Sequence, residues 1–252
     1  MGARYRANTS QVPKEEERGG ILCFDQWLSY KSELQPPFPL RDIHQILVHD
    51  GKLWVTCPFD NMIGVYDGAS REAWRPLGIP SGERRDVNHF NSLTGWGNKL
   101  CIVAHNWSGV TGKPSELHFF GLPDRGRRRS IAPGNQAHNA WLHEGEIMTC
   151  SSGEGRLVGL GGKSIQTGGF PRGIAYLDGE ICVGISEFAE RPDRDLGNGW
   201  FQIFDSQWKL PRTIKMTGEG MVTDMMAITP IEAEQIIYRR DFGQLRFDVE
   251  PA

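Results

Sequence analysis

The sequence predicts an all-β fold built from repeated four-stranded units, and three observations support this prediction. Strand-like pairs recur around tight turns, among them His49-Asp-Gly51, His143-Glu-Gly145 and Leu177-Asp-Gly179. Asp-Gly between two strand-like runs is a strong hairpin signal, and Glu-Gly is a weaker one. The units follow one another at about 34 to 52 residues, and 31 Gly and 15 Pro are spread along the chain. Four short strands per unit at this spacing are typical of a β-propeller.

The N-terminal part of the chain is expected to differ from the repeats. Residues 1–19 are polar and predict a flexible tail, so a single propeller domain is expected over residues 20–252. Two strand-like runs, Gly20–Asp25 and Trp27–Tyr30, come before the first repeat.

Five repeats follow, each with two inner strands, and the first four also have a third, outer strand-like run. They cover residues 42–57 with 63–67, 86–105 with 116–120, 136–151 with 156–160, 170–186 with 200–205, and 221–230 with 235–238.

The first and last repeats predict how the propeller closes. The fifth inner pair is followed by little that resembles outer strands, whereas the N-terminal runs are outer-type strands without an inner pair before them. We therefore expect five blades, with the N-terminal strands completing the last one, because closure removes exposed sheet edges. Six blades are the alternative.

Composition and charge exclude several classes of protein. The 252 residues carry a formal net charge of −3, so no overall basic field predicts binding to nucleic acid or to an anionic membrane. No apolar run approaches the ~20 residues of a membrane span. The N-terminus lacks an apolar signal segment, and the five Cys form no C-x-x-C pair, so reduced thiols and a cytoplasmic location are expected.

An ordered series of short motifs resembles a known family. The motifs are Asp42-Ile-His44, Asn88-His-Phe-Asn-Ser92, the run from His138 to Gly145, Gly169-Phe-Pro-Arg-Gly173 and Val222-Thr-Asp-Met-Met-Ala227. In this order they resemble an uncharacterised family of conserved hypothetical β-propeller proteins, some of which are linked to tetratricopeptide-repeat proteins. The resemblance implies a propeller that typically has six blades, one more than this chain shows. It implies no activity.

One repeat position stands out chemically. His44 and His138 each lie seven residues before their hairpin glycine, and Arg172 lies seven before Gly179. His89 lies eight before Gly97, which fits the same position if that turn is one residue longer, and the fifth repeat has Asp224 nearby. Because the first strands of a propeller line its central channel, these side chains are expected to converge.

Three imidazoles and one carboxylate are a suitable ligand set for Zn²⁺ or Fe²⁺ with a position left for substrate. We therefore predict a metal site made by His44, His89, His138 and Asp224. Two alternatives stay open: a metal-free ligand or catalytic site, and a cluster of polar groups that bond one another and water.

Further candidates come from the same end of the predicted strands. Asn91 and Asn139 could orient the imidazoles or contact substrate, and His105 could be a fourth ligand or an acid–base group. Arg172 suits an anionic substrate group, or else forms a salt bridge with Asp224 or Glu187.

Further residues follow the fourth inner pair or lie on turns and outer strands. Glu187 is the best carboxylate for proton transfer, with Ser186 beside it as a substrate contact. The charged loop 188–198 after them could be a lid or a solvated connection. His49 and His143 on hairpin turns are expected to be exposed, and His118 to be structural.

The sequence thus predicts a metal-dependent enzyme that acts on a small anionic molecule. Oxygenase, lyase or isomerase, and hydrolase chemistry are all compatible with the predicted ligands. The alternative is a propeller without catalytic activity that binds a small ligand or a protein partner.

Overall fold

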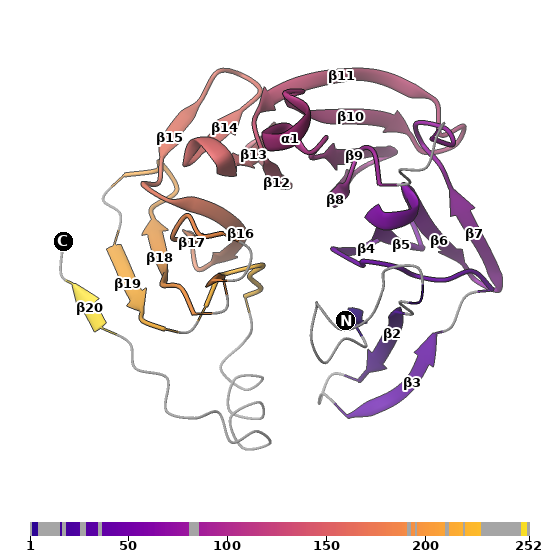
Figure 1. Ribbon diagram of the computed structural model, residues 1–252, viewed down its shortest axis with the longest axis horizontal. Coiled ribbons are helices and arrows are strands. Elements are labelled where there is room, and N and C mark those ends of the chain that lie inside the picture. Colours follow the sequence, from indigo (N-terminus) through magenta and orange to yellow (C-terminus); the bar gives the residue numbers. More distant parts are fainter. Residues whose placement is uncertain are drawn as a thin grey trace. The chain divides into compact units, whose positions relative to one another are not determined.

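The computed structural model describes residues 2–4, 16, 19–25, 29–34, 37–80, 86–190, 193–194, 196–209, 212–218, 220–227 and 248–250. Their contacts divide the chain into two compact units, Met1–Ile147 and Met148–Ala252. Figure 1 shows that nearly all regular structure consists of antiparallel strands.

The first unit begins with a three-stranded sheet in the order β1-β2-β3. Its strands are β1 (Gly2–Arg4), β2 (Gly19–Phe24) and β3 (Tyr30–Leu34). The sequence places a flexible tail over residues 1–19, but residues 2–4 pair with β2. Because β2 has β1 on one side and β3 on the other, its pairing differs from the predicted completion of a fifth blade.

Two four-stranded sheets follow, in the orders β4-β5-β6-β7 and β11-β10-β9-β8. The first contains β4 (Ile46–His49), β5 (Lys52–Cys57), β6 (Met62–Asp67) and β7 (Ser70–Trp74), with η1 (Pro58–Asp60) after β5. The second contains β8 (Phe90–Trp96), β9 (Lys99–Ala104), β10 (Ser115–Gly121) and β11 (Arg127–Gly134), with α1 (Ser108–Thr111) after β9. Each is a meander in which consecutive strands are neighbours.

The next sheet has the order β12-β13-β14-β15, and the border between the two units falls within β13. Its elements are β12 (Ala137–His143), β13 (Glu146–Ser151), η2 (Ser152–Glu154), β14 (Arg156–Gly159) and β15 (Ser164–Gln166).

The second unit continues with a five-stranded sheet, β16-β17-β18-β19-β20. Its strands are β16 (Phe170–Leu177), β17 (Glu180–Ser186), β18 (Gly199–Phe204), β19 (Arg212–Met216) and β20 (Asp248–Glu250). The predicted fifth inner pair is not a pair of strands here, since residues 221–227 have no regular structure. Its second strand, residues 235–238, lies outside the described residues.

The core of the first unit lies between neighbouring sheets. One cluster joins Trp54 and Val65 to Leu93, Ile102 and Phe120, all at most 1 % exposed. A second cluster packs β2 against the sheet of β4 to β7 and includes the following buried side chains: Ile21, Leu40, Ile43, Val55, Cys57, Met62 and Tyr66. The strands β5, β6 and β9 bury consecutive residues, and since successive side chains point to opposite faces, both of their faces are covered.

The predicted class is confirmed: the fold is nearly all-β and is built from consecutive antiparallel sheets, three of which are four-stranded meanders, the blade organisation of a β-propeller. The cysteines are free, as expected, and Cys57, Cys101 and Cys150 are buried. Burial raises the pKa of these three thiols because the thiolate would lose its solvation.

Candidate metal centre

Asp42 and His44 lie on the segment that enters β4. Asp42 has a left-handed backbone with φ of 56° and is 2 % exposed. The segment is held by Gln45 and Thr56: the Gln45 amide donates to Thr56 Oγ1 at 2.8 Å, and the Thr56 amide donates to the Gln45 carbonyl at 3.0 Å. These bonds fix the backbone that carries both side chains.

His89 lies directly before β8 and has a φ of 51°. Its carbonyl accepts the His105 amide at 3.2 Å. Its Nδ1 lies 2.9 Å from Oδ2 of Asp86, three residues earlier, and both side chains are about 10 % exposed. Since a carboxylate only accepts, Nδ1 carries the proton and Nε2 holds the lone pair. A carboxylate behind an imidazole fixes its tautomer and the orientation of its ring.

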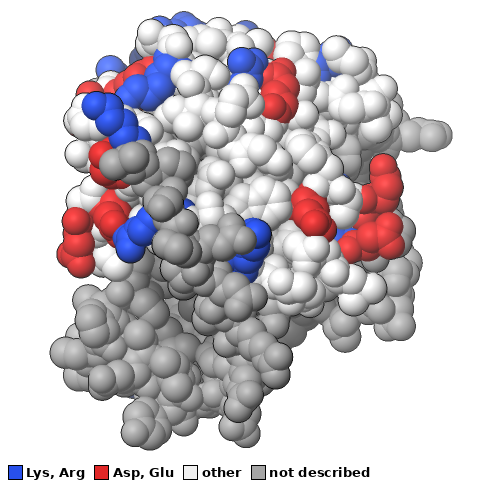
Figure 2. Space-filling view, turned by 90° about the vertical axis from the view of Figure 1, so that its left-hand side faces the viewer, with Lys and Arg blue, Asp and Glu red and all other residues white. Residues whose placement is uncertain are grey.

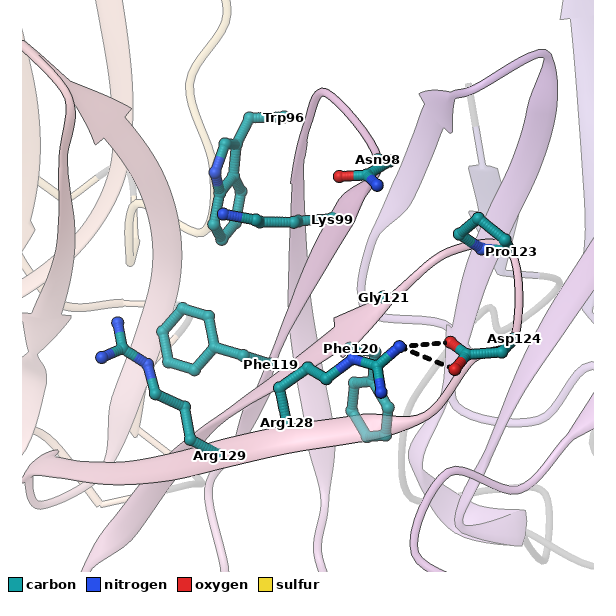
Figure 3. A pocket seen from close by; sticks show the side chains of 10 residues that line it. All are labelled: Trp96, Asn98, Lys99, Phe119, Phe120, Gly121, Pro123, Asp124, Arg128 and Arg129. Atoms are coloured by element: carbon teal, nitrogen blue, oxygen red, sulfur yellow. Dashed lines mark hydrogen bonds and ion pairs between the residues drawn. The ribbon is translucent and has the colours of Figure 1, made fainter.

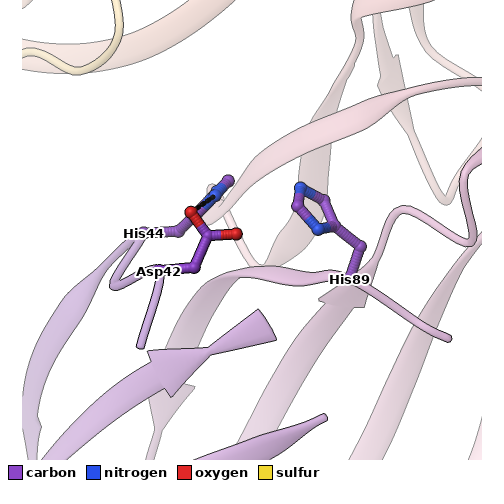
Figure 4. Close-up of side chains that lie close together, drawn as sticks. All are labelled: Asp42, His44 and His89. Atoms are coloured by element: carbon purple, nitrogen blue, oxygen red, sulfur yellow. Dashed lines mark ion pairs between the residues drawn. The ribbon is translucent and has the colours of Figure 1, made fainter. Parts of the chain in front are cut away.

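Asp42, His44 and His89 form the centre of the site, and their potential ligand atoms all lie within 4.8 Å of one another. Figure 4 shows the imidazole of His89 facing the pair of Asp42 and His44. His44 Nε2 lies 3.7 Å from Oδ1 of Asp42, and the rings of His44 and His89 are 4.7 Å apart at 85°.

Two further imidazoles extend the cluster. The ring of His105 lies 5.5 Å from that of His89 and 5.4 Å from that of His138. The backbone amide of Trp107 donates to His105 Nδ1 at 3.1 Å, so the neutral ring carries its proton on Nε2. His138 has the opposite tautomer, because its Nδ1 donates to the Gln136 carbonyl at 2.8 Å. At Nε2, the neutral His105 ring can therefore donate a hydrogen bond, whereas the His138 ring can accept one.

Trp107 connects the members of this cluster. Its ring lies 4.3 Å from the ring of His89, and its Nε1 donates to the Asp86 carbonyl at 3.1 Å. Trp107 and Asn106 both have left-handed backbones, with φ of 52° and 56°. Such conformations cost energy in non-glycine residues and persist only where the surroundings impose them.

Three asparagines tie the site to the two sheets beside it. Asn61 Nδ2 donates to Oδ1 of Asn88 at 3.1 Å, and the Asn88 amide donates back to Oδ1 of Asn61 at 3.0 Å. Asn88 Nδ2 then donates to Oδ1 of Asn106 at 3.1 Å. Since Asn88 comes directly before His89, this chain of bonds positions the imidazole.

The hairpin register corrects the predicted repeat position. Trp96 pairs with Lys99, so this turn has two residues like the turn between His49 and Lys52. Counted along the chain from this turn, Asn91 takes the place of His44 and His138 in the second repeat, and His89 takes the place of Asp42. Asn91 is the extra residue of a bulge, which shifts the strand pairing by one residue before Ser92. The prediction of a longer turn was wrong, although His89 does reach the cluster.

The two asparagines predicted beside the imidazoles have separate surroundings. Asn91 lies at a bulge in β8, and its side chain donates to the Ala137 carbonyl at 2.8 Å and accepts from Ser92 at 3.2 Å. These bonds join β8 to β12 and place His138. Asn139 has a left-handed backbone, with φ of 49°.

The remaining predicted residues belong to the second unit. Arg172 lies in β16 and contacts Met221 Sδ through Nη1 at 3.7 Å. Ser186 is 1 % exposed, and its hydroxyl accepts the Val222 amide at 2.8 Å. The backbone of Asp224 packs against Gly173.

Glu187 closes the base of the loop that follows β17. Asn198 donates to it from its side chain at 2.9 Å and from its amide at 3.1 Å. These bonds, the side-chain bond foremost, lower the pKa of Glu187. The carboxyl group is thus a weaker base than an ordinary glutamate, which does not favour the predicted proton transfer.

The hairpin histidines are less exposed than predicted. His143 is 8 % exposed, and its Nε2 lies 3.9 Å from a carboxylate oxygen of Glu144. The ring of His49 packs so closely on Gly95 that a Cβ there would lie 2.3 Å from it. The prediction of exposed turn histidines was wrong: the turns themselves are exposed, but the His143 side chain is buried and the half-buried His49 ring packs on Gly95 of β8.

His118 gives the protein an expected pH dependence. It is 2 % exposed, and burial lowers its pKa, outweighing the opposite effect of Glu116, while Arg127 lowers it further. A lowered pKa in the folded state means that the unfolded chain binds more protons, so stability falls as pH drops below about 6.5. We expect the unfolding temperature to drop less between pH 7.5 and 5.5 in His118→Leu than in the unchanged protein. An equal drop in both would contradict this assignment.

Comparisons with known proteins identify no family. No family model matches the chain, and no curated protein sequence matches it. Among solved structures, an inactive variant of virginiamycin B lyase from Staphylococcus aureus with quinupristin is 14 % identical, with a TM-score of 0.44 over 75 % of this chain and 71 % of that one. A functionally unknown protein from Desulfotomaculum acetoxidans is 11 % identical, with a TM-score of 0.44 over 77 % and 74 %.

In the part of the chain that the structure describes, no helix has the length and hydropathy to cross a membrane. On the face shown in Figure 2, acidic and basic side chains are interspersed among uncharged ones, and no large area has a single sign.

Proposed function

We propose that Asp42, His44 and His89 bind one divalent transition metal, Fe²⁺ or Zn²⁺, in an enzyme that acts on a small molecule. The observation that carries this proposal is the approach of three ligand atoms to within 4.8 Å of one another. Metal–ligand bonds of ~2.0–2.2 Å put neighbouring ligand atoms about 3.4 Å apart, so a small inward movement would complete the site. Two histidines and one carboxylate are a common set for both metals.

The residues around this set support the proposal. Asp86 holds Nδ1–H of His89, which directs the lone pair of Nε2 away from Asp86, as in many metal sites. His105 is not among the proposed ligands, because its Nδ1 already accepts the Trp107 amide. The repeat pattern does not predict Asp42 as a ligand, because Asp42 lies two residues before His44 and not at the repeat position.

A metal in this position would act as a Lewis acid that activates water or a bound substrate oxygen. The protein's own contribution comes from His105 and His138. Nε2–H of the neutral His105 ring can donate a hydrogen bond to substrate, and Nε2 of His138 can accept a proton. Opposite tautomers on neighbouring rings provide a hydrogen-bond donor and a base in one site.

Several finer expectations remain proposals. The reaction can be that of an oxygenase, a lyase or isomerase, or a hydrolase. An anionic substrate is expected from Arg172. The cytoplasmic location and the absence of nucleic-acid and membrane partners are expectations from sequence alone.

A second candidate function is acid–base catalysis without metal. The 2.9 Å bond between Asp86 and His89 favours it, since this pairing is also how enzymes orient a general base. In this case Asp42 would stabilise a protonated His44.

Metal analysis of the purified protein tests the first proposal. After incubation with Fe²⁺ or Zn²⁺ and removal of excess metal, we expect about one equivalent per chain. Asp42→Ala should retain less than about a tenth of it, because a charged ligand is lost. The control is Asp67→Ala, which removes an exposed carboxylate that pairs with Lys52.

Two results would contradict the metal proposal. One is a protein that binds no metal after incubation, which would favour the metal-free candidate. The other is equal metal content in Asp42→Ala and Asp67→Ala, which would show that any bound metal lies elsewhere.

A further inference from the structure

A pocket of about 480 Å³ lies at the opposite end of the sheet that carries His89. Figure 3 shows it between the β8–β9 turn, with Trp96 and Lys99, and the start of β11, with Arg128 and Arg129. Since β8 runs from Phe90 to Trp96, the length of a strand separates the pocket from the candidate metal centre.

The pocket carries unbalanced positive charge. Arg128 is engaged with Asp124, whose carboxylate accepts from it at 2.8 and 2.6 Å. Among the described residues, no carboxylate forms an ion pair with Lys99 or Arg129. Lys99 and Arg129 thus line the pocket without an ion-pair partner among the described residues, although the whole chain has a formal net charge of −3.

The pocket also has an aromatic wall. The rings of Trp96 and Phe119 meet edge to face with centroids 6.0 Å apart. The guanidinium of Arg129 lies 4.8 Å from the centroid of Phe119. This contact favours one orientation of the exposed Arg129 side chain, which lowers the entropy that it would lose on binding an anion.

We propose that this pocket binds a small anionic ligand that also carries an aromatic ring, of the size and chemistry of a nucleoside diphosphate. Lys99 and Arg129 would contact the anionic group, and Trp96 would contact the ring. The volume falls in the range of small-molecule sites, and a few charged groups among aromatic side chains are the usual composition of such sites. This ligand would be distinct from the substrate of the candidate metal centre.

The function of Arg128 follows from its pairing with Asp124. The backbone amide of Gly126 and the side chain of Arg128 lower the pKa of Asp124, which keeps this carboxylate ionised. Arg128 is thus a wall of the pocket rather than an anion contact. Arg128 and Arg129 therefore have different proposed roles: Arg128 pairs with Asp124, and Arg129 contacts the anion.

Titration calorimetry with the full chain and adenosine diphosphate tests the proposal. We expect saturable binding that Arg129→Gln and Lys99→Gln each weaken by about tenfold or more, because charge-assisted bonds to phosphate are lost. Trp96→Leu should weaken it by about three- to tenfold. The control is Lys163→Gln, which removes a lysine that also lies over a tryptophan, Trp208, but far along the chain from the pocket.

Each outcome decides a part of the proposal. Absence of binding, or equal binding in Arg129→Gln and Lys163→Gln, would overturn the pocket as an anion site. Inorganic pyrophosphate that binds as tightly as adenosine diphosphate would overturn the aromatic part. Binding that is weakened equally by Asp42→Ala would place the ligand at the candidate metal centre instead.

Discussion

Replacing His89 with alanine is expected to weaken the binding of Fe²⁺ or Zn²⁺ by more than about 100-fold, since loss of a ligand exceeds the 10- to 100-fold effect of losing its supporting carboxylate. His89 belongs to the group whose ligand atoms lie within 4.8 Å of one another. Competition with a fluorescent chelator would measure the affinity. Asp86→Asn should show the smaller, 10- to 100-fold loss.

The contrast with His138 makes this test specific. His138 lies beyond His105 in the row of rings, so His138→Ala should retain metal affinity within about threefold. Bound metal should also raise the unfolding temperature of His138→Ala but not of His89→Ala, because a ligand stabilises only the state that binds it. Equal loss of metal in both variants would restore the ligand set expected from sequence, with His138 as a ligand.

Replacing Phe120 with alanine is expected to lower the free energy of unfolding by about 3–5 kcal/mol. Phe120 is 1 % exposed, lies in the larger core cluster of the first unit and meets the ring of Trp74 at 5.0 Å. Its removal leaves a cavity between two sheets that strand backbones cannot fill by local movement. Chemical denaturation followed by circular dichroism would measure the loss.

Phe188→Ala is the matched control for this effect. Its ring is 60 % exposed and contacts Phe170 at 5.9 Å, so the loss should stay within about 1 kcal/mol. A loss below about 1.5 kcal/mol in Phe120→Ala would contradict the close packing of the first unit.

Much of the fold could be predicted from local signals. The Asp-Gly hairpins at residues 50–51 and 178–179 lie where the sequence predicts them, with both residues in left-handed conformations. The end of the chain could not be predicted in this way, because pairing over long sequence separation has no local signal. The N-terminal strand β2 pairs with β1. The sequence instead predicts that the N-terminal strands form one blade with inner strands from residues 221–238.

The site could be predicted only in part. His44, His89 and His138 do gather, with His105, from strand entries and exits. Asp42 was missed because its carboxylate reaches His44 through a left-handed backbone, which the alternation of a strand does not predict. Asp86 and Trp107 were not predicted because they lie in loops, where the direction of a side chain does not follow from its position in the sequence.

The asparagine chain through Asn61, Asn88 and Asn106 makes the site a joint property of two sheets. Opening of the sheet whose β5–β6 connection carries Asn61 releases Asn88, and His89 then loses its fixed position. The affinity of the proposed metal site would therefore be thermodynamically linked to the local stability of both sheets. A surface mutation far from the imidazoles that loosens either sheet would lower the apparent metal affinity in proportion to the fraction of chains in which the site stays formed.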